Sequence, residues 1–250
     1  MIRILLPVFL LSLALLGIHS YFGLEIIRRG IIFTDLAIGQ MAALGAAVSL
    51  SFLDGRLLYP LSLGFALFAG IGIALVSKRT AHLEAFIGIL YAFGISGVFL
   101  LFSKSPQGME VFQRFMASDI LFIPLKKIVH VAFWYSVLGI SIYVINHKLK
   151  GRLREILFFV TFAVTVTSSV EMVGVLVVFA ILIGPASTVI NLSIDKSIFT
   201  AWIIGTVINL LALLISYLFD FPTGYCLVFM HSFVALPAFF ISKKRRLGPS

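Results

Sequence analysis

Residues 198–218 read IFTAWIIGTVINLLALLISYL and include no charged side chain. A helix of this length rises about 31 Å at 1.5 Å per residue, which matches the hydrocarbon core of a bilayer. Similar runs recur along the chain, which is 61% hydrophobic and 12% charged. Because a water-soluble domain must keep its exterior polar, this composition predicts an all-α polytopic membrane protein that forms one transmembrane domain over residues 1–250.

Nine stretches are candidate spans. They cover residues 4–22, 30–52, 57–77, 84–103, 128–146, 154–169, 172–190, 198–218 and 222–241. The first lacks a small-residue cleavage site, so we expect a true span rather than a signal peptide. The sixth and seventh are separated by polar residues 165–172 (TVTSSVEM), for which a broken or re-entrant segment is an alternative to a tight hairpin. The sequence is therefore compatible with eight or nine spans.

The net charge of +9 indicates membrane orientation and not a nucleic-acid-binding surface, because the basic residues lie in short loops between apolar runs. With the tail Lys243–Arg246 in the cytoplasm, nine spans place thirteen of the nineteen Lys and Arg residues inside. This bias predicts a cytoplasmic C-terminus and an outside N-terminus. Near the inner interface, Glu25 is expected to cap a helix or to pair with Arg28 or Arg29.

The longest connection, residues 104–127, is expected on the outer side. Its apolar residues include Phe112, Phe115 and Met116. They predict a short amphipathic helix lying at the membrane interface.

No enzyme motif is present. The chain has no Walker A sequence, no HExxH and no GxSxG, and its five histidines and single Cys226 form no metal-binding pattern. We therefore expect no catalytic residues, no cofactor bound by this chain, and no ATP hydrolysis on this chain.

The second span carries the residues that point to transport. A carboxylate inside a span is costly unless it faces a cavity or a partner, so Asp35 is a candidate metal-pathway residue, with a helix cap as the alternative. Gln40 is a candidate for the same pathway or for an interhelical hydrogen bond. Gly39, Ala43 and Ala47 lie four apart with Asp35 and predict close helix packing.

Two other segments carry candidates. Glu171, in the polar break, is a speculative pore residue. In residues 173–191 (VGVLVVFAILIGPASTVIN), Pro185 is expected to kink or end the helix, with a short cytoplasmic helix after it. Such an exposed element is what a soluble ATPase would grip, although an ordinary corner between helices is the alternative. The expected coupling residues are Gly184, Pro185, Ala186, Ser187, Thr188 and Asn191.

Several segments, in this order, resemble the permease family of zinc and manganese ABC importers. They are Arg28-Arg29-Gly30 with Phe33 and Gly45, Glu84 with Ile87-Gly88, Asp119-Ile120-Leu121, the run from Val173 through Thr188, and Asp220-Phe221-Pro222-Thr223-Gly224. The resemblance covers nearly the whole chain.

The resemblance implies a homodimeric permease in a bacterial or archaeal cytoplasmic membrane, with a fold similar to the vitamin B12 importer permeases. It also implies a cytoplasmic ATPase that uses ATP and Mg²⁺ and presses near residues 186–197. An extracytoplasmic metal-binding protein would deliver the ion.

The chain departs from the family pattern at one point. The family motif has an Asp and a His four residues apart on the second span, where this chain has Leu36 and Gln40. A leucine and a glutamine are poor ligands for a bare dication. The resemblance therefore assigns Gln40 to the pathway without assigning the metal chemistry.

Three alternative functions stay open. An ion-coupled secondary transporter needs ionisable residues near the bilayer midplane, and this chain has few. An ABC permease for a non-metal solute is the second alternative. A structural scaffold, which would have no pore, is a third and weaker reading.

Overall fold

The computed structural model describes residues 2–77, 82–103, 108–117, 120, 123–192 and 198–241, and these residues form helices and no strand. The ten helices are α1 (Ile2–Arg29), α2 (Thr34–Phe52), α3 (Leu58–Val76), α4 (Leu83–Phe102), α5 (Gly108–Met116), α6 (Leu125–Lys148), α7 (Gly151–Val173), α8 (Val175–Asn191), α9 (Ile198–Phe219) and α10 (Thr223–Ile241). The all-α polytopic fold predicted from composition is confirmed.

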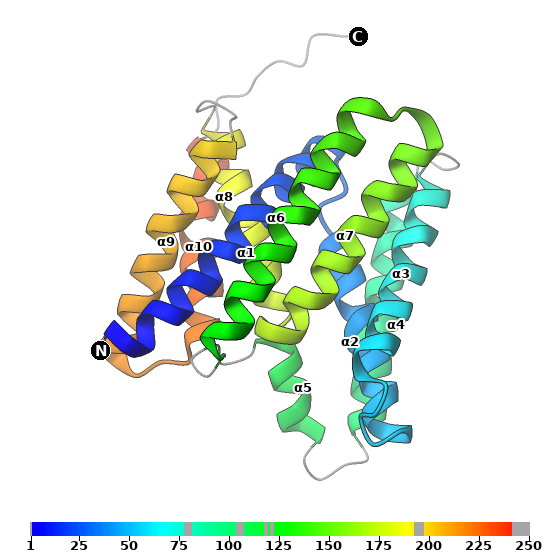
Figure 1. Ribbon diagram of the computed structural model, residues 1–250, viewed down its shortest axis with the longest axis horizontal. Coiled ribbons are helices and arrows are strands. Elements are labelled where there is room, and N and C mark those ends of the chain that lie inside the picture. Colours follow the sequence, from blue (N-terminus) through cyan, green and yellow to red (C-terminus); the bar gives the residue numbers. More distant parts are fainter. Residues whose placement is uncertain are drawn as a thin grey trace.

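Eight of these helices are long and apolar enough to cross a membrane, and α8 is a shorter apolar helix of 17 residues. The long helices and α8 alternate in direction, and the first and last of them begin and end at opposite ends of the molecule (Figure 1). The nine stretches read from the sequence correspond to α1–α4 and α6–α10. A length of about 25 Å for α8 falls short of a full hydrocarbon thickness of about 30 Å.

Of the two alternatives for residues 165–172, the broken or re-entrant segment is wrong, because α7 runs without interruption to Val173 and a tight turn joins it to α8. Its polar side chains stay helical by bonding to their own backbone: the Thr165, Thr167 and Ser169 hydroxyls each donate to the carbonyl four residues earlier, at 2.8–2.9 Å. The Tyr135 hydroxyl of α6 also bonds Ser169 at 2.6 Å. These bonds satisfy the hydroxyls inside an apolar bundle.

The break between α7 and α8 lies instead at Gly174, which has φ 87°. This left-handed conformation favours glycine. A Cβ at this position would also lie 2.7 Å from the Met116 carbonyl oxygen. A single glycine therefore turns the chain between two helices and lets the end of α5 approach the turn.

The short helix predicted within residues 104–127 is present as α5, but its aromatic side chains pack against α4. Phe112 packs edge-on against Phe99, and Phe115 stacks on Phe102 at 6.1 Å between ring centroids. In Figure 1, α5 lies beyond the α7–α8 turn and beside α4. The amphipathic pattern of α5 therefore reflects packing of its apolar residues against α4.

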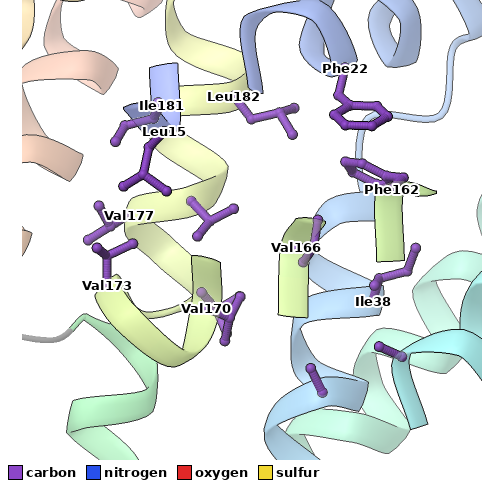
Figure 2. Packing of buried hydrophobic residues seen from close by; sticks show 14 of the residues in the cluster. Leu15, Phe22, Ile38, Phe162, Val166, Val170, Val173, Val177, Ile181 and Leu182 are labelled. Carbon is purple, nitrogen blue, oxygen red and sulfur yellow. The ribbon is translucent and has the colours of Figure 1, made fainter. Parts of the chain in front are cut away.

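The core lies where α1, α2, α7 and α8 meet. Figure 2 shows Phe22 of α1 beside Phe162 of α7, and Leu15 of α1 beside Val177 and Ile181 of α8. The Phe22 and Phe162 rings are 4.8 Å apart. Because lipid tails are as apolar as these side chains, close packing rather than the hydrophobic effect holds the helices together.

An ion pair and a cation–π contact join the C-terminal end of α1 to α7. Arg29 donates to Glu155 at 2.7 Å, and its guanidinium lies 4.0 Å from the centre of the Phe158 ring. Glu25 pairs with both Arg28 and Arg29, as the sequence predicted in one of its two alternatives.

Some expectations fall on residues outside those described. They are the basic residues Lys78, Arg79, Lys104 and Lys196, the outer-helix residues Asp119 and Leu121, the coupling segment 193–197, and the tail Lys243–Arg246.

Candidate translocation pathway

Helix α2 is the central helix of the molecule. It contacts α3, α4, α7 and α8, and most of its residues are buried. The small residues predicted to allow close packing do so. Ala43 and Ala47 are buried, and a Cβ on Gly39 would lie 3.0 Å from Val175 of α8. Helix α2 is therefore enclosed by four neighbouring helices over most of its length.

Another glycine makes the closest approach of α2 to a neighbour. A Cβ at Gly45 would lie 2.3 Å from the Leu61 carbonyl oxygen of α3. No real Cβ contact is that short, so the α2–α3 contact depends on the absence of a side chain there.

Asp35 lies in the first turn of α2 and is 1% exposed. Its side chain makes no capping hydrogen bond, and both carboxylate oxygens are buried without a partner among the described residues. The alternative that Asp35 caps the helix is therefore wrong. A buried, unpartnered carboxylate inside a membrane helix is costly, so Asp35 remains a candidate functional residue.

Gln40 lies about 7.5 Å further along the α2 axis and is also 1% exposed. Its amide nitrogen is 3.7 Å from the Met116 sulfur at the end of α5, and its amide oxygen is buried without a partner in the described part of the chain. The backbone of Gln40 is also in close contact with Gly94 of α4. The interhelical contact predicted for Gln40 therefore exists, and it leaves one polar atom free.

Asp35 and Gln40 do not form one ligand set. Five residues separate them, so their side chains leave a straight helix about 140° apart. Within the described residues, no group of three or more His, Cys, Asp or Glu side chains lies close enough to hold a metal ion.

Glu171 is not part of this buried set. It is exposed on the last turns of α7, where Lys127 and Tyr59 are its electrostatic neighbours. Its neighbour Val170 packs at Gly39 of α2, whereas Glu171 itself is exposed. The structure thus separates Glu171 from the other two candidates.

The segment predicted to form an exposed coupling element is instead buried inside α8. The helix continues through Pro185 to Asn191, and Gly184, Pro185, Ala186, Ser187 and Thr188 are all buried. Ser187 and Thr188 both donate to the Gly184 carbonyl, at 3.0 and 2.8 Å. The prediction of an exposed helix after Pro185 is wrong for Ala186, Ser187 and Thr188, and among the six expected coupling residues only Asn191 is partly exposed.

Packing explains why α8 does not end at Pro185. The Pro185 ring lies 3.1 Å from where a Cβ on Gly205 of α9 would be, and a Cβ at Gly184 would lie 3.0 Å from His231 of α10. Neighbouring helices hold the segment helical even though the proline lacks an N–H. Tertiary contacts override the local preference of proline here.

Sequence reasoning missed a buried polar connection beside this point. His231 Nε2 lies 2.9 Å from the Asn209 amide oxygen, and the Asn209 amide donates to the Ser12 carbonyl at 3.5 Å. These three residues join α10, α9 and α1. An asparagine in the apolar run 198–218 was the available signal, because an intramembrane amide needs a partner.

Taken together, α2 has a carboxylate in its first turn and, further along the helix, a neutral amide beside a thioether. These groups are few, separate and incompletely satisfied. They suit a route that contacts a cation weakly and releases it, since conduction requires weak binding at several points.

Comparison with known proteins is consistent with this interpretation. Residues 147–242 match a family model described as the ABC 3 transport family. The chain is 28% identical to a Haemophilus influenzae protein named "Probable iron transport system membrane protein", over 96% of this chain and 90% of that one. It is 27% identical to the Listeria innocua "Manganese transport system membrane protein MntC", over 92% of this chain and 88% of that one.

A solved structure has the same fold. It is titled "PsaBC from Streptococcus pneumoniae in complex with Fab", and it matches with a TM-score of 0.71 and 21% identity over 96% of this chain and 92% of that chain.

Proposed function

We infer that this chain is a permease of the ABC 3 transport family and forms the membrane-spanning subunit of an ABC importer for a divalent metal ion. The observation that carries this conclusion is similarity along 92–96% of the chain to membrane proteins named for manganese and iron transport. The bundle of membrane-crossing helices around a polar α2 supports it.

We propose that the energy comes from a separate cytoplasmic ATPase that binds ATP and Mg²⁺. This chain contains no Walker A motif, and a loop that cradles the phosphates is what ATP hydrolysis requires. An extracytoplasmic metal-binding protein delivers the ion, and two copies of the permease form the working unit. The chain lies in the cytoplasmic membrane with its C-terminus inside.

The proposed mechanism is alternating access. ATP closes the motor dimer, the inner ends of the helices move, and helices packed through small residues shift against one another. The contacts at Gly39 and Gly45 allow such movement only as discrete repacking, because a packed interior is not continuously deformable. In this mechanism the ion passes Gln40 before Asp35, since Gln40 lies beneath the outer helix α5 and Asp35 lies near the inner end of α2.

The relatives rank manganese and iron above zinc as cargo. The donors along α2 are oxygen and a thioether without histidine, which agrees with the missing Asp/His pair. Oxygen donors suit Mn²⁺, and the softer sulfur suits later metals.

The experiment is metal uptake in bacteria that lack their own manganese and iron importers. The chain is expressed with the ATPase and the metal-binding protein encoded beside it. We expect accumulation of radioactive manganese or iron that disappears when the ATPase carries an inactivating Walker A substitution. Uptake that is independent of the ATPase would favour the secondary-transporter alternative, and uptake of no metal would favour a non-metal solute.

A further inference from the structure

A groove lies on the surface of the helix bundle between α1, α6 and the first turns of α9. It has a volume of about 530 Å³, and its lining includes Gly17, Tyr21, Gly139, Tyr143 and Trp202. In Figure 1, α1 passes behind α6 and lies between α6 and α9, so that α1 forms the floor. Apart from its tyrosines, the tryptophan and one serine, the lining is apolar.

The groove is fixed by contacts at its sides. Trp202 of α9 donates from its indole nitrogen to the Gly17 carbonyl of α1 at 3.1 Å. The Asn146 amide of α6 donates to the Tyr21 hydroxyl of α1. These bonds fix the spacing of α6 and α9 relative to α1. A Cβ added at Gly17 or at Gly139 would have no neighbouring atom within 4 Å. The groove is therefore open space along the helices.

The end of the groove near Tyr21 is positively charged. Glu25, Arg29 and Arg154 all lie within electrostatic range of the Tyr21 hydroxyl. Arg29 is neutralised by Glu25 and Glu155. Arg154 forms no ion pair among the described residues, and its Nε is buried without a hydrogen-bond partner.

Further positive charge lies at the same end of the helices. Lys148 ends α6, and Lys150 and Arg152 lie at the start of α7. This is the end assigned to the cytoplasm. An apolar groove within the bilayer that ends at an unpaired arginine complements a lipid with an acyl chain and a negative headgroup.

We propose that this groove binds an anionic phospholipid of the inner leaflet, with one acyl chain along α1 between α6 and α9 and the phosphate at Arg154. The inference rests on the orientation given under the proposed function and is independent of the cargo. Tyr21, Tyr143 and Trp202 are the residue types enriched at the level of lipid headgroups.

The two tryptophans of the chain allow a direct test, because Trp202 lines the groove and Trp134 lies on the exposed first half of α6. The full chain carrying Trp134→Phe is placed in phosphatidylcholine vesicles that contain brominated phosphatidylglycerol or brominated phosphatidylcholine at equal mole fraction. Bromine quenches a tryptophan that it touches. We expect stronger quenching of Trp202 by the brominated phosphatidylglycerol, with a relative affinity about fivefold above that of phosphatidylcholine for the one unpaired cation.

Matched variants separate the charge from the groove. Arg154→Gln is expected to remove that fivefold preference, whereas Arg56→Gln, which removes the same charge from an exposed loop at the other end, leaves it intact. Gly139→Leu is expected to reduce quenching by both lipids, while Gly64→Leu on exposed α3 does not. In the reciprocal variant Trp202→Phe, the remaining fluorescence comes from Trp134, and both brominated lipids should quench it equally.

Equal quenching of Trp202 by the two brominated lipids would overturn the proposal. Quenching by neither lipid would also overturn the proposal, because neither lipid would then be in contact with Trp202. Because lipid contact is measured without transport, a negative result here leaves the permease function standing, and a failure of metal uptake leaves this measurement valid.

Discussion

Asp35 and Gln40 are both buried in α2, and neither has all of its polar side-chain atoms satisfied by the described residues. A protein interior normally pairs such groups, because leaving one unpaired costs free energy. The two unsatisfied side chains therefore lower the stability of the fold. Each yields a prediction that separates the effect of a substitution on stability from its effect on transport.

Asp35→Asn is expected to stabilise the fold and to impair transport. An unpaired carboxylate costs more to bury than an unpaired amide, so the free energy of unfolding should rise by roughly 2 kcal/mol. Thermal unfolding in detergent and metal uptake in cells measure the two effects. Asp54→Asn, in an exposed outer turn with positive φ that asparagine tolerates, is the control and should change neither. Unchanged uptake in Asp35→Asn would remove Asp35 from the pathway.

Gln40→Leu is expected to reduce uptake about tenfold, the scale of loss when a polar group that supports metal binding is removed. The free energy of unfolding should change by less than about 1 kcal/mol, because the protein loses only a long amide–sulfur contact. Uptake kinetics and unfolding in detergent provide the measurements, with Gln113→Leu on the exposed side of α5 as the control. Normal uptake by Gln40→Leu would show that the residue serves packing alone.

At the scale of helices, α2 and α3 depend on one close contact. Gly45→Val would place a side chain 2.3 Å from the Leu61 carbonyl, and we expect a loss of about 3 kcal/mol or more of stability. Gly64→Val, on α3 with open space around it, is the matched control and should be neutral. Equal unfolding midpoints for the two variants in detergent would contradict the packing assigned to α2.

Two substitutions in α8 distinguish residues needed for packing from residues proposed to contact the ATPase. Gly184→Val would collide with His231 at 3.0 Å and should lower the unfolding midpoint. Asn191→Arg, at the partly exposed end of α8, should keep that midpoint while reducing ATPase binding in a pull-down with the partner subunit. If Asn191→Arg bound the ATPase normally, the coupling site would lie elsewhere.

Helix α8 also shows which structural features could not be predicted from the sequence. The spans were predictable because a run such as 198–218 has only one way to satisfy its backbone in lipid. The course of α8 past Pro185 was not, because it depends on Gly205 and His231, which are 20 and 46 residues away in the chain. Similarly, the polar residues 165–169 suggested a broken segment as one alternative. The sequence does not show that their hydroxyls bond to the backbone of their own helix.

The candidate site was predictable in part for the same reason. Asp35 and Gln40 stood out as polar residues in an apolar run, and both proved to be buried. The partner of Gln40, Met116, lies 76 residues away. Glu171 had the same sequence signal as Asp35 but lies on the exposed side of α7. Polarity inside a span identifies candidates, and only the helix arrangement decides which of them face the interior.

For the whole molecule, the shortage of buried ionisable residues favours an external energy source. Asp35 is the only Asp or Glu among the described residues that is buried. Coupling to an ion gradient usually requires several such groups around broken helices near the midplane. The bundle has the small-residue contacts needed for helices to repack, and its energy is proposed to come from ATP hydrolysis on another subunit.

The most direct test is metal flux into proteoliposomes that contain this chain with or without its ATPase. With the ATPase, the metal-binding protein and ATP present, radioactive manganese or iron should accumulate, and removal of ATP should stop it. Vesicles that hold the chain alone should accumulate nothing under an imposed proton or sodium gradient. Gradient-driven accumulation by the chain alone would contradict the account.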